Sequence, residues 1–108
     1  PPDIADNRRV GVAGRNPLTG AMVTGLSPAV AEDYAIPYED GGVVIYKIRS
    51  GSLARLNGLL PGDVITKING KTIKTVDEVL RYLSRSRDGW KIEYRRGDQV
   101  QSLFVQTW

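Results

Sequence analysis

Residues 42–73 read GVVIYKIRSGSLARLNGLLPGDVITKINGKTI, and this stretch decides the fold. It opens with a β-branched, apolar run at 43–48. This run is too short and too apolar for a surface helix, so it predicts a buried strand. Residues 53–56 then predict one or two helical turns that end at Asn57-Gly58, because Gly can adopt the left-handed conformation that often follows a helix.

The second half of this stretch predicts a further strand and a tight turn. Pro61-Gly62-Asp63 is typical of a chain reversal, in which the Asp side chain can accept backbone N–H bonds. The apolar-rich run at 64–68 predicts a strand. Asn69-Gly70 tolerates positive φ and predicts a two-residue turn into a brief strand at 72–73.

Short elements are also predicted on both sides of this stretch. Residues 21–26 alternate as a strand does, and Ser27-Pro28 is a helix start signal, because the Ser hydroxyl can accept an N–H bond while Pro occupies the first helical position. Thr75 and Glu78 have the spacing of a capping box. Apolar residues recur three and four apart in the segment 76–85, which predicts an amphipathic helix.

The chain ends in a predicted hairpin of residues 90–94 and 102–106. Short strands and helices without a long βαβ rhythm favour an α+β fold. We therefore expect a partial β-barrel of five to six strands with two to three short helices. Residues 1–13, rich in Pro and Gly, are expected to be a linker, and 14–108 a single domain.

Composition excludes several kinds of catalytic site. The chain has 108 residues, 41% hydrophobic and 25% charged, as an ordinary globular domain has, and no apolar run long enough to span a membrane. It contains neither His nor Cys, so no Ser-His-Asp or Cys-His centre and no His or Cys zinc site can form. Ser-Lys dyads and paired carboxylates stay formally open. We expect a non-catalytic domain with no metal site and no cofactor.

The net charge of +3 leaves an anion-binding or nucleic-acid-binding module as an alternative. Basic residues gather in the C-terminal third, but few aromatic residues, such as Trp90 and Tyr94, lie among them. A solvated helix end and hairpin is the favoured interpretation of this cluster, which comprises Arg81, Arg85, Arg87, Lys91, Arg95 and Arg96.

The pieces at 42–73 closely resemble the signature of bacterial PDZ domains. In that signature a G-V-x-V strand leads to an S-x-A helix, a G-L-x-P-G-D-x-I segment and an I-N-G hairpin, and this chain departs from it at Leu53, where proline is usual. The resemblance implies a circularly permuted fold of the bacterial type. The strand that comes first in animal PDZ domains would be supplied here by residues 101–106.

The N-terminal part is similar to the start of the last PDZ domain in HtrA proteases of the Do type. The similarity rests on NPLTGA at 16–21 and LSPAVAE at 26–32. It implies a periplasmic protein with an upstream serine endopeptidase domain that is not in this chain. The partners implied are hydrophobic C-terminal or unfolded peptide segments, and the parent's own protease and PDZ domains in an oligomer, with no nucleic acid.

PDZ domains bind a peptide as an added strand at an open sheet edge, while a loop of backbone N–H groups takes the terminal carboxylate. The resemblance assigns that loop to Leu18-Thr19-Gly20-Ala21, with a polar Thr19 where the family is usually hydrophobic. The receiving strand would be 21–25, which includes Met22 and Val23. Arg15 is a candidate donor to the carboxylate, or a solvated loop residue.

The helix at 76–85 would line the other side of the groove with Val76, Leu80 and Leu83, and Val79 would enter the core. We expect Val76 and Leu80 to be exposed in the groove. The alternative is that all four side chains belong to the core, as apolar stripes usually do. A domain used mainly for oligomer assembly, docked onto a neighbouring PDZ domain, is an alternative function.

Overall fold

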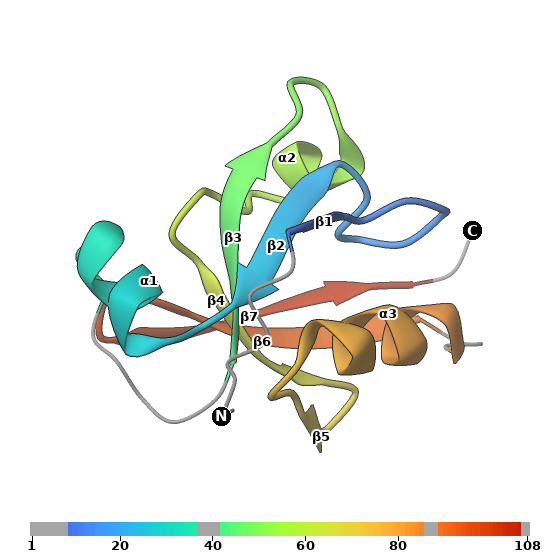
Figure 1. The fold of residues 1–108 in the computed structure, drawn as a ribbon. Helices are drawn as coiled ribbons and strands as arrows, with labels where there is room; N and C mark the ends of the chain where they lie inside the picture. The colour runs from blue at the N-terminus through green and yellow to red at the C-terminus, as the bar shows by residue number, and fades with distance from the viewer. Residues whose placement is uncertain (1–8, 37–41, 86–88, 107–108) are drawn as a thin grey trace.

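The computed structural model describes residues 9–36, 42–85 and 89–106. Within these ranges the chain forms seven strands and three short helices (Figure 1). Their order is β1 (Val10–Gly11), β2 (Ala21–Gly25), α1 (Pro28–Asp33), β3 (Val43–Ile48), α2 (Leu53–Leu56), β4 (Val64–Ile68), β5 (Lys71–Thr72), α3 (Val76–Arg85), β6 (Trp90–Arg96) and β7 (Gln99–Val105). The predicted α+β class is confirmed.

The strands form one sheet in the order β1-β2-β3-β4-β6-β7, with β5 paired to β4 beside this path. Each of these pairings is antiparallel. Helix α3 packs against β2 and β4, on the side of the molecule away from α1 (Figure 1). Strand β2 therefore lies between β1 and β3 and beside α3, which makes its surroundings the place to look for a site.

The core is built from the apolar faces that the sequence predicted. The main cluster joins the sheet to α3 and includes Ile45, Ile65, Ile68, Val79 and Ile92, all fully buried. A second, smaller cluster lies under α1 and contains Leu26, Ala31, Val44 and Val64. Over the described ranges, no helix has both the length and the apolar character needed to cross a membrane.

The predicted helix starts are confirmed by their hydrogen bonds. The Ser27 hydroxyl accepts from the Val30 N–H at 3.2 Å, with Pro28 at the first helical position of α1. At α3, the Glu78 N–H donates to Thr75 Oγ1 at 3.2 Å, and the Thr75 N–H donates to Glu78 Oε1 at 3.0 Å. This reciprocal pair is the capping box, which satisfies N–H groups that have no partner inside the helix.

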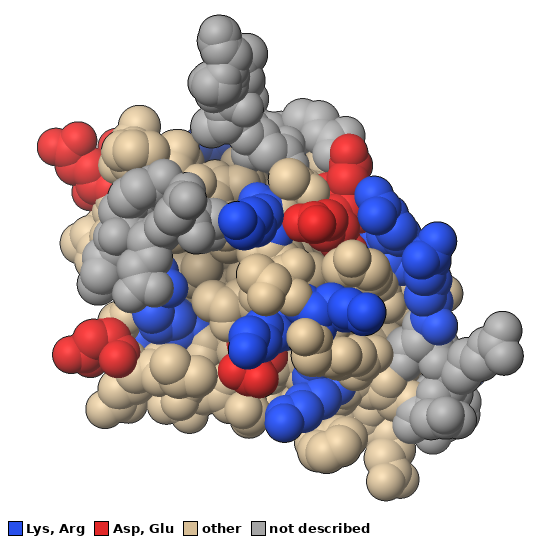
Figure 2. All heavy atoms as spheres, turned by 90° about the horizontal axis from the view of Figure 1, so that it is seen from below, with Lys and Arg blue, Asp and Glu red and all other residues tan. Residues whose placement is uncertain are grey.

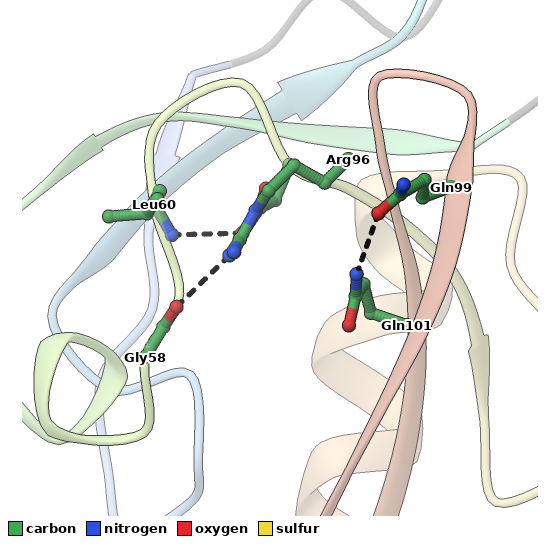
Figure 3. Close-up of polar contacts among 6 residues, drawn as sticks. Gly58, Leu60, Arg96, Gln99 and Gln101 are labelled. Carbon is green, nitrogen blue, oxygen red and sulfur yellow. Dashed lines mark hydrogen bonds and ion pairs between the residues drawn. The ribbon is translucent and has the colours of Figure 1, made fainter.

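The buried Asp63 accepts three hydrogen bonds. The predicted bond from the turn comes from the Leu60 N–H at 2.9 Å. Arg96 supplies the other two through Nε and Nη2, each at 2.8 Å, and its Nη2 also donates to the Gly58 carbonyl at 3.0 Å (Figure 3). Hydrogen bonding to Asp63 raises the pKa of Arg96 above its ordinary value. The pair therefore ties the 58–63 turn to the end of β6.

The sheet has one strand more than the five to six expected, and the addition is β1. Two residues containing a Gly show no strand periodicity, so their extended conformation depends on pairing with β2. This pairing lies inside the segment expected to be a linker, of which residues 1–8 fall outside the described residues. The domain boundary at residue 13 stays a prediction.

Candidate functional site

The edge of β2 opposite β3 is occupied by β1. Val10 is paired with Val23 and Gly11 with Met22 in antiparallel register. Beyond the strand, the Val12 N–H donates to the Ala21 carbonyl at 2.8 Å, and the Gly20 N–H donates to the Val12 carbonyl at 3.0 Å. The edge expected to receive a peptide thus already carries an extended segment of the same chain.

In the expected carboxylate loop, the N–H groups of the last three residues donate to backbone carbonyls. The Thr19 N–H donates to Asn16 O at 3.2 Å and the Ala21 N–H to Leu18 O at 2.9 Å, while Gly20 bonds to Val12. A carboxylate at this loop would have to replace at least one of these acceptors. The Gly20 N–H is the one whose acceptor lies farthest away in the chain, because Val12 belongs to the extended segment that follows β1.

Two polar side chains shape the segment that connects β1 to β2. The Thr19 hydroxyl donates to the Gly14 carbonyl at 2.8 Å and accepts from the Asn16 N–H at 3.2 Å. The buried Asn16 side chain accepts from the Leu18 N–H at 2.9 Å and donates to the Ala13 carbonyl at 3.0 Å. These bonds explain a polar Thr19 where the family is usually hydrophobic. Asn16 was missed as a structural residue, although Asn before Pro is a known turn signal.

Gly20 lies in close contact with the start of α2. Its φ is +95°, and a Cβ at this position would lie 2.6 Å from Ser52 Oγ. The Thr19 carbonyl accepts from the Ala54 N–H at 3.0 Å, and the Gly20 carbonyl accepts from the Arg49 N–H at 2.8 Å. The position of the loop before β2 is therefore set by α2 and by the segment that precedes α2. Gly20 is needed for this packing.

The α3 side chains take different places from those expected. Val79 is fully buried in the core, as predicted. Val76 is also fully buried and Leu83 is 3% exposed, so neither lies in an open groove, whereas Leu80 is half-buried. The expectation that Val76 is exposed is wrong for this conformation. The physical reason is that α3 packs against β2 and β4, and Val76 belongs to the core cluster that joins this helix to the sheet.

Two cavities flank the segment after β1. The first, of about 350 Å³, lies between this segment and α3. Its lining includes Leu80, Leu83 and Arg15, the candidate hydrogen-bond donor to a peptide carboxylate. The second, of about 680 Å³, lies toward β3 and the start of α2, and its lining includes Lys47 and Arg49. Val12, Ala13 and Gly14 line both cavities.

Most of the predicted site residues are brought together around these cavities. Thr19, Gly20, Ala21 and Met22 line the second cavity, and Leu80, Leu83 and Arg15 line the first. Leu18, Val23 and Val76 are fully buried behind them. Sequence reasoning missed Val12, because nothing in its neighbourhood alternates long enough to suggest a strand.

Comparison with known proteins shows which family this chain resembles. A profile described as PDZ domain matches residues 18–107. A "Probable periplasmic serine endoprotease DegP-like" of Marinomonas sp. (strain MWYL1) is 39% identical over 85 residues, which are 78% of this chain and 17% of that protein. "Serine protease HTRA2, mitochondrial" of Drosophila persimilis is 41% identical over 65 residues, 60% of this chain and 15% of that protein.

Among solved structures, "HtrA-type protease AlgW with decapeptide" superposes with a TM-score of 0.70 at 27% identity. The match covers 81% of this chain and 27% of that one. The chain therefore spans only a small part of the length of the proteases that it matches.

Proposed function

Because the chain belongs to the PDZ domain family and is related to the PDZ domains of HtrA/DegP serine proteases, we propose that it is the peptide-binding module of such a protease. It would recognise hydrophobic C-terminal or unfolded peptide segments by strand addition to β2. The observation that carries the proposal is the β1–β2 pairing, in which this edge holds an extended, antiparallel segment beside α3. A related protease that is described with a decapeptide supports it.

Affinity and selectivity would come from different parts of the site. Backbone N–H and C=O groups of β2 can pair with any extended chain, so they add affinity without distinguishing one peptide sequence from another. Selectivity would come from the apolar walls around the cavity beside α3, which include Leu80, Leu83 and Trp90. A short strand with one apolar pocket supports micromolar binding, about −7 to −8 kcal/mol.

Titration of the isotope-labelled chain with decapeptides ending in Val, Leu or Phe tests this proposal. Resonances of β2 and α3 should shift, with a micromolar Kd. Shifts confined to β7, or none up to millimolar peptide, would contradict it. The same peptides with an amidated C-terminus show whether the loop at 18–21 takes a carboxylate: an unchanged Kd means that it does not.

Several observations weigh against the anion-binding alternative. Lys and Arg are spread over the face seen in Figure 2, with Asp and Glu among them rather than in one uniform basic patch. Of the basic cluster in the C-terminal third, Arg95 is 7% exposed and Arg96 is bound to Asp63, while Arg87 lies outside the described residues. A steep loss of nucleic-acid affinity with salt would revive this alternative.

Oligomer assembly is the second candidate function. It is favoured by the N–H groups of the loop, which already have acceptors in the chain and are not free to take a peptide carboxylate. Removing this domain from its parent protease and measuring the oligomer mass distinguishes the two: assembly predicts a smaller oligomer, and peptide capture an unchanged one. A periplasmic parent protease and a circularly permuted strand order, with β7 in the place of the first strand, belong to the same proposal.

A further inference from the structure

We infer that β1 and the following Val12 form an intramolecular ligand of the peptide-binding edge, so that an external peptide binds only after this segment is released. The inference rests on the proposed function and adds its regulation. The first observation is the register. Val12 uses its N–H and carbonyl toward Ala21 and Gly20, which are the groups at the loop end of β2 that an added strand would use.

The second observation is the burial of Val12. Its side chain is 5% exposed and joins the core cluster that contains Val76 and Leu83, two of the residues expected to line the groove. Its neighbours Gly11 and Ala13 are exposed. Val12, together with the partly buried Val10 that packs against the same cluster, thus anchors a segment whose intervening residue is exposed, as the alternate side chains of a ligand strand would.

The third observation is that the segment divides what would be one groove. Val12, Ala13 and Gly14 form a wall common to the cavity beside α3 and the cavity beside Ser52. Lifting these residues would join the two cavities along β2. The resulting groove would run between α3 and the start of α2, and it would expose the Gly20 N–H.

The strand pairing that holds the segment is short, so its release is local. Strand β1 has two residues, against five residue pairs between β2 and β3. At its start, the Arg9 guanidinium lies over the Tyr46 ring at 4.7 Å. After it, Gly14 and Arg15 are exposed. Short edge pairings of this kind open at lower free energy than the strands of the core.

The bound segment also indicates the chemistry of the external ligand. The group on the Gly20 N–H is the carbonyl of Val12 inside a continuous chain, not a carboxylate. The site therefore accommodates an internal extended segment. A ligand that competes with β1 should carry an aliphatic residue at the position of Val12, and at the position before it a residue that is free to vary, because Gly11 is exposed.

A reversible disulfide that holds β1 against β2 tests the inference. Gly11 and Met22 face each other next to the hydrogen-bonded pair of Val12, and a Cβ on Gly11 would lie 3.5 Å from Met22 Sδ. Non-hydrogen-bonded pairs approach closely enough for a disulfide. The chain has no Cys, so the double variant Gly11→Cys/Met22→Cys forms at most this one bond. The probe is an amidated heptapeptide with the sequence of residues 8–14, RRVGVAG.

The reduced double variant should bind the heptapeptide at least tenfold more tightly than the oxidised form of the same protein. In a second variant, Val12→Asp, the charge disfavours the buried position, so heptapeptide affinity should rise at least tenfold over the unmodified chain. Val100→Asp is the matched control: its side chain is 70% exposed on β7, and affinity should not change.

Equal affinity of the oxidised and reduced forms, with the disulfide verified by mass, would overturn the inference and leave the proposed function standing. Absence of binding by the reduced form and by Val12→Asp, to the heptapeptide and to the decapeptides alike, would overturn both. Should Val12→Asp lose its folded NMR spectrum, the comparison of oxidised and reduced forms decides alone.

Discussion

Replacing Gly20 by Ala tests how the loop before β2 is built. The change adds strain, because φ is +95° and a left-handed conformation costs an L-residue about 1–2 kcal/mol. It also adds a clash, because the new Cβ would lie 2.6 Å from Ser52 Oγ. Overpacking of this kind costs about 1–3 kcal/mol. Together these effects lower the free energy of unfolding by about 2–5 kcal/mol.

Thermal unfolding measures this loss. At about 4–8 °C per kcal/mol for a domain near this size, the Gly20→Ala variant should melt at least about 8 °C below the unmodified chain. Ser52→Gly in the same chain removes the clashing side chain. Ser52 caps α2 by accepting from the Arg55 N–H, and a Ser to Gly change at such a position costs only a few tenths of a kcal/mol.

The double variant should therefore recover the overpacking part of the loss and keep the φ strain. A different result would refute the reasoning. If Gly20→Ala keeps full stability and loses only peptide binding, Gly20 serves as an anion site and not as a contact with α2. If Ser52→Gly recovers nothing, the clash is relieved elsewhere and the loop is looser than the structure shows.

Three further predictions concern the rest of the domain. Val79→Glu places a charge at a fully buried position and should unfold the chain in circular dichroism, whereas Leu80→Glu, at a half-buried one, should lower stability by about 1 kcal/mol and weaken peptide binding tenfold. If Leu80→Glu unfolds and Val79→Glu does not, the orientation of α3 is wrong. Arg96→Met leaves the carboxylate of Asp63, 1% exposed, without its ion pair and should cost about 1–3 kcal/mol in urea unfolding, because the Arg96 side chain is 39% exposed and solvent screens part of the interaction; an unchanged free energy of unfolding would mean that water replaces the guanidinium. Thr75→Ala removes the α3 cap and should cost about 1 kcal/mol by thermal unfolding, and an unchanged melting temperature would contradict the cap's contribution.

The elements that the sequence predicted best are those with a strong local signal. The run at 43–48, the helix at 53–56 and the helix at 76–85 were predicted with the bounds that the structure has. Their β-branched composition, caps and spacing all favour the same conformation, so local preference and tertiary packing agree. The resemblance to the family could also be recognised from the sequence, because the motifs that carry it consist of turn and cap residues in a set order.

The surroundings of the candidate site were less predictable. Val76 lies on the helix face expected to line a groove, but its burial depends on how α3 packs against β2 and β4, which are distant from much of the helix in the sequence. Arg96 shows no sequence signal for Asp63, because their contact depends on the pairing of β4 with β6. A charged side chain has several possible partners in the sequence, and its actual partner is known only once the register of the strands is known.

By itself, the sequence determined the order and type of the local elements, the family and the absence of His and Cys chemistry. The tertiary structure alone decided what fills the edge of β2. Residues 10–12 alternate over too short a run to predict a strand, and the backbone bonds from Val12 to Ala21 and Gly20 do not depend on the residue type at position 12. Such pairing is non-local and made by groups common to almost every residue, so it becomes visible only once the chain is folded.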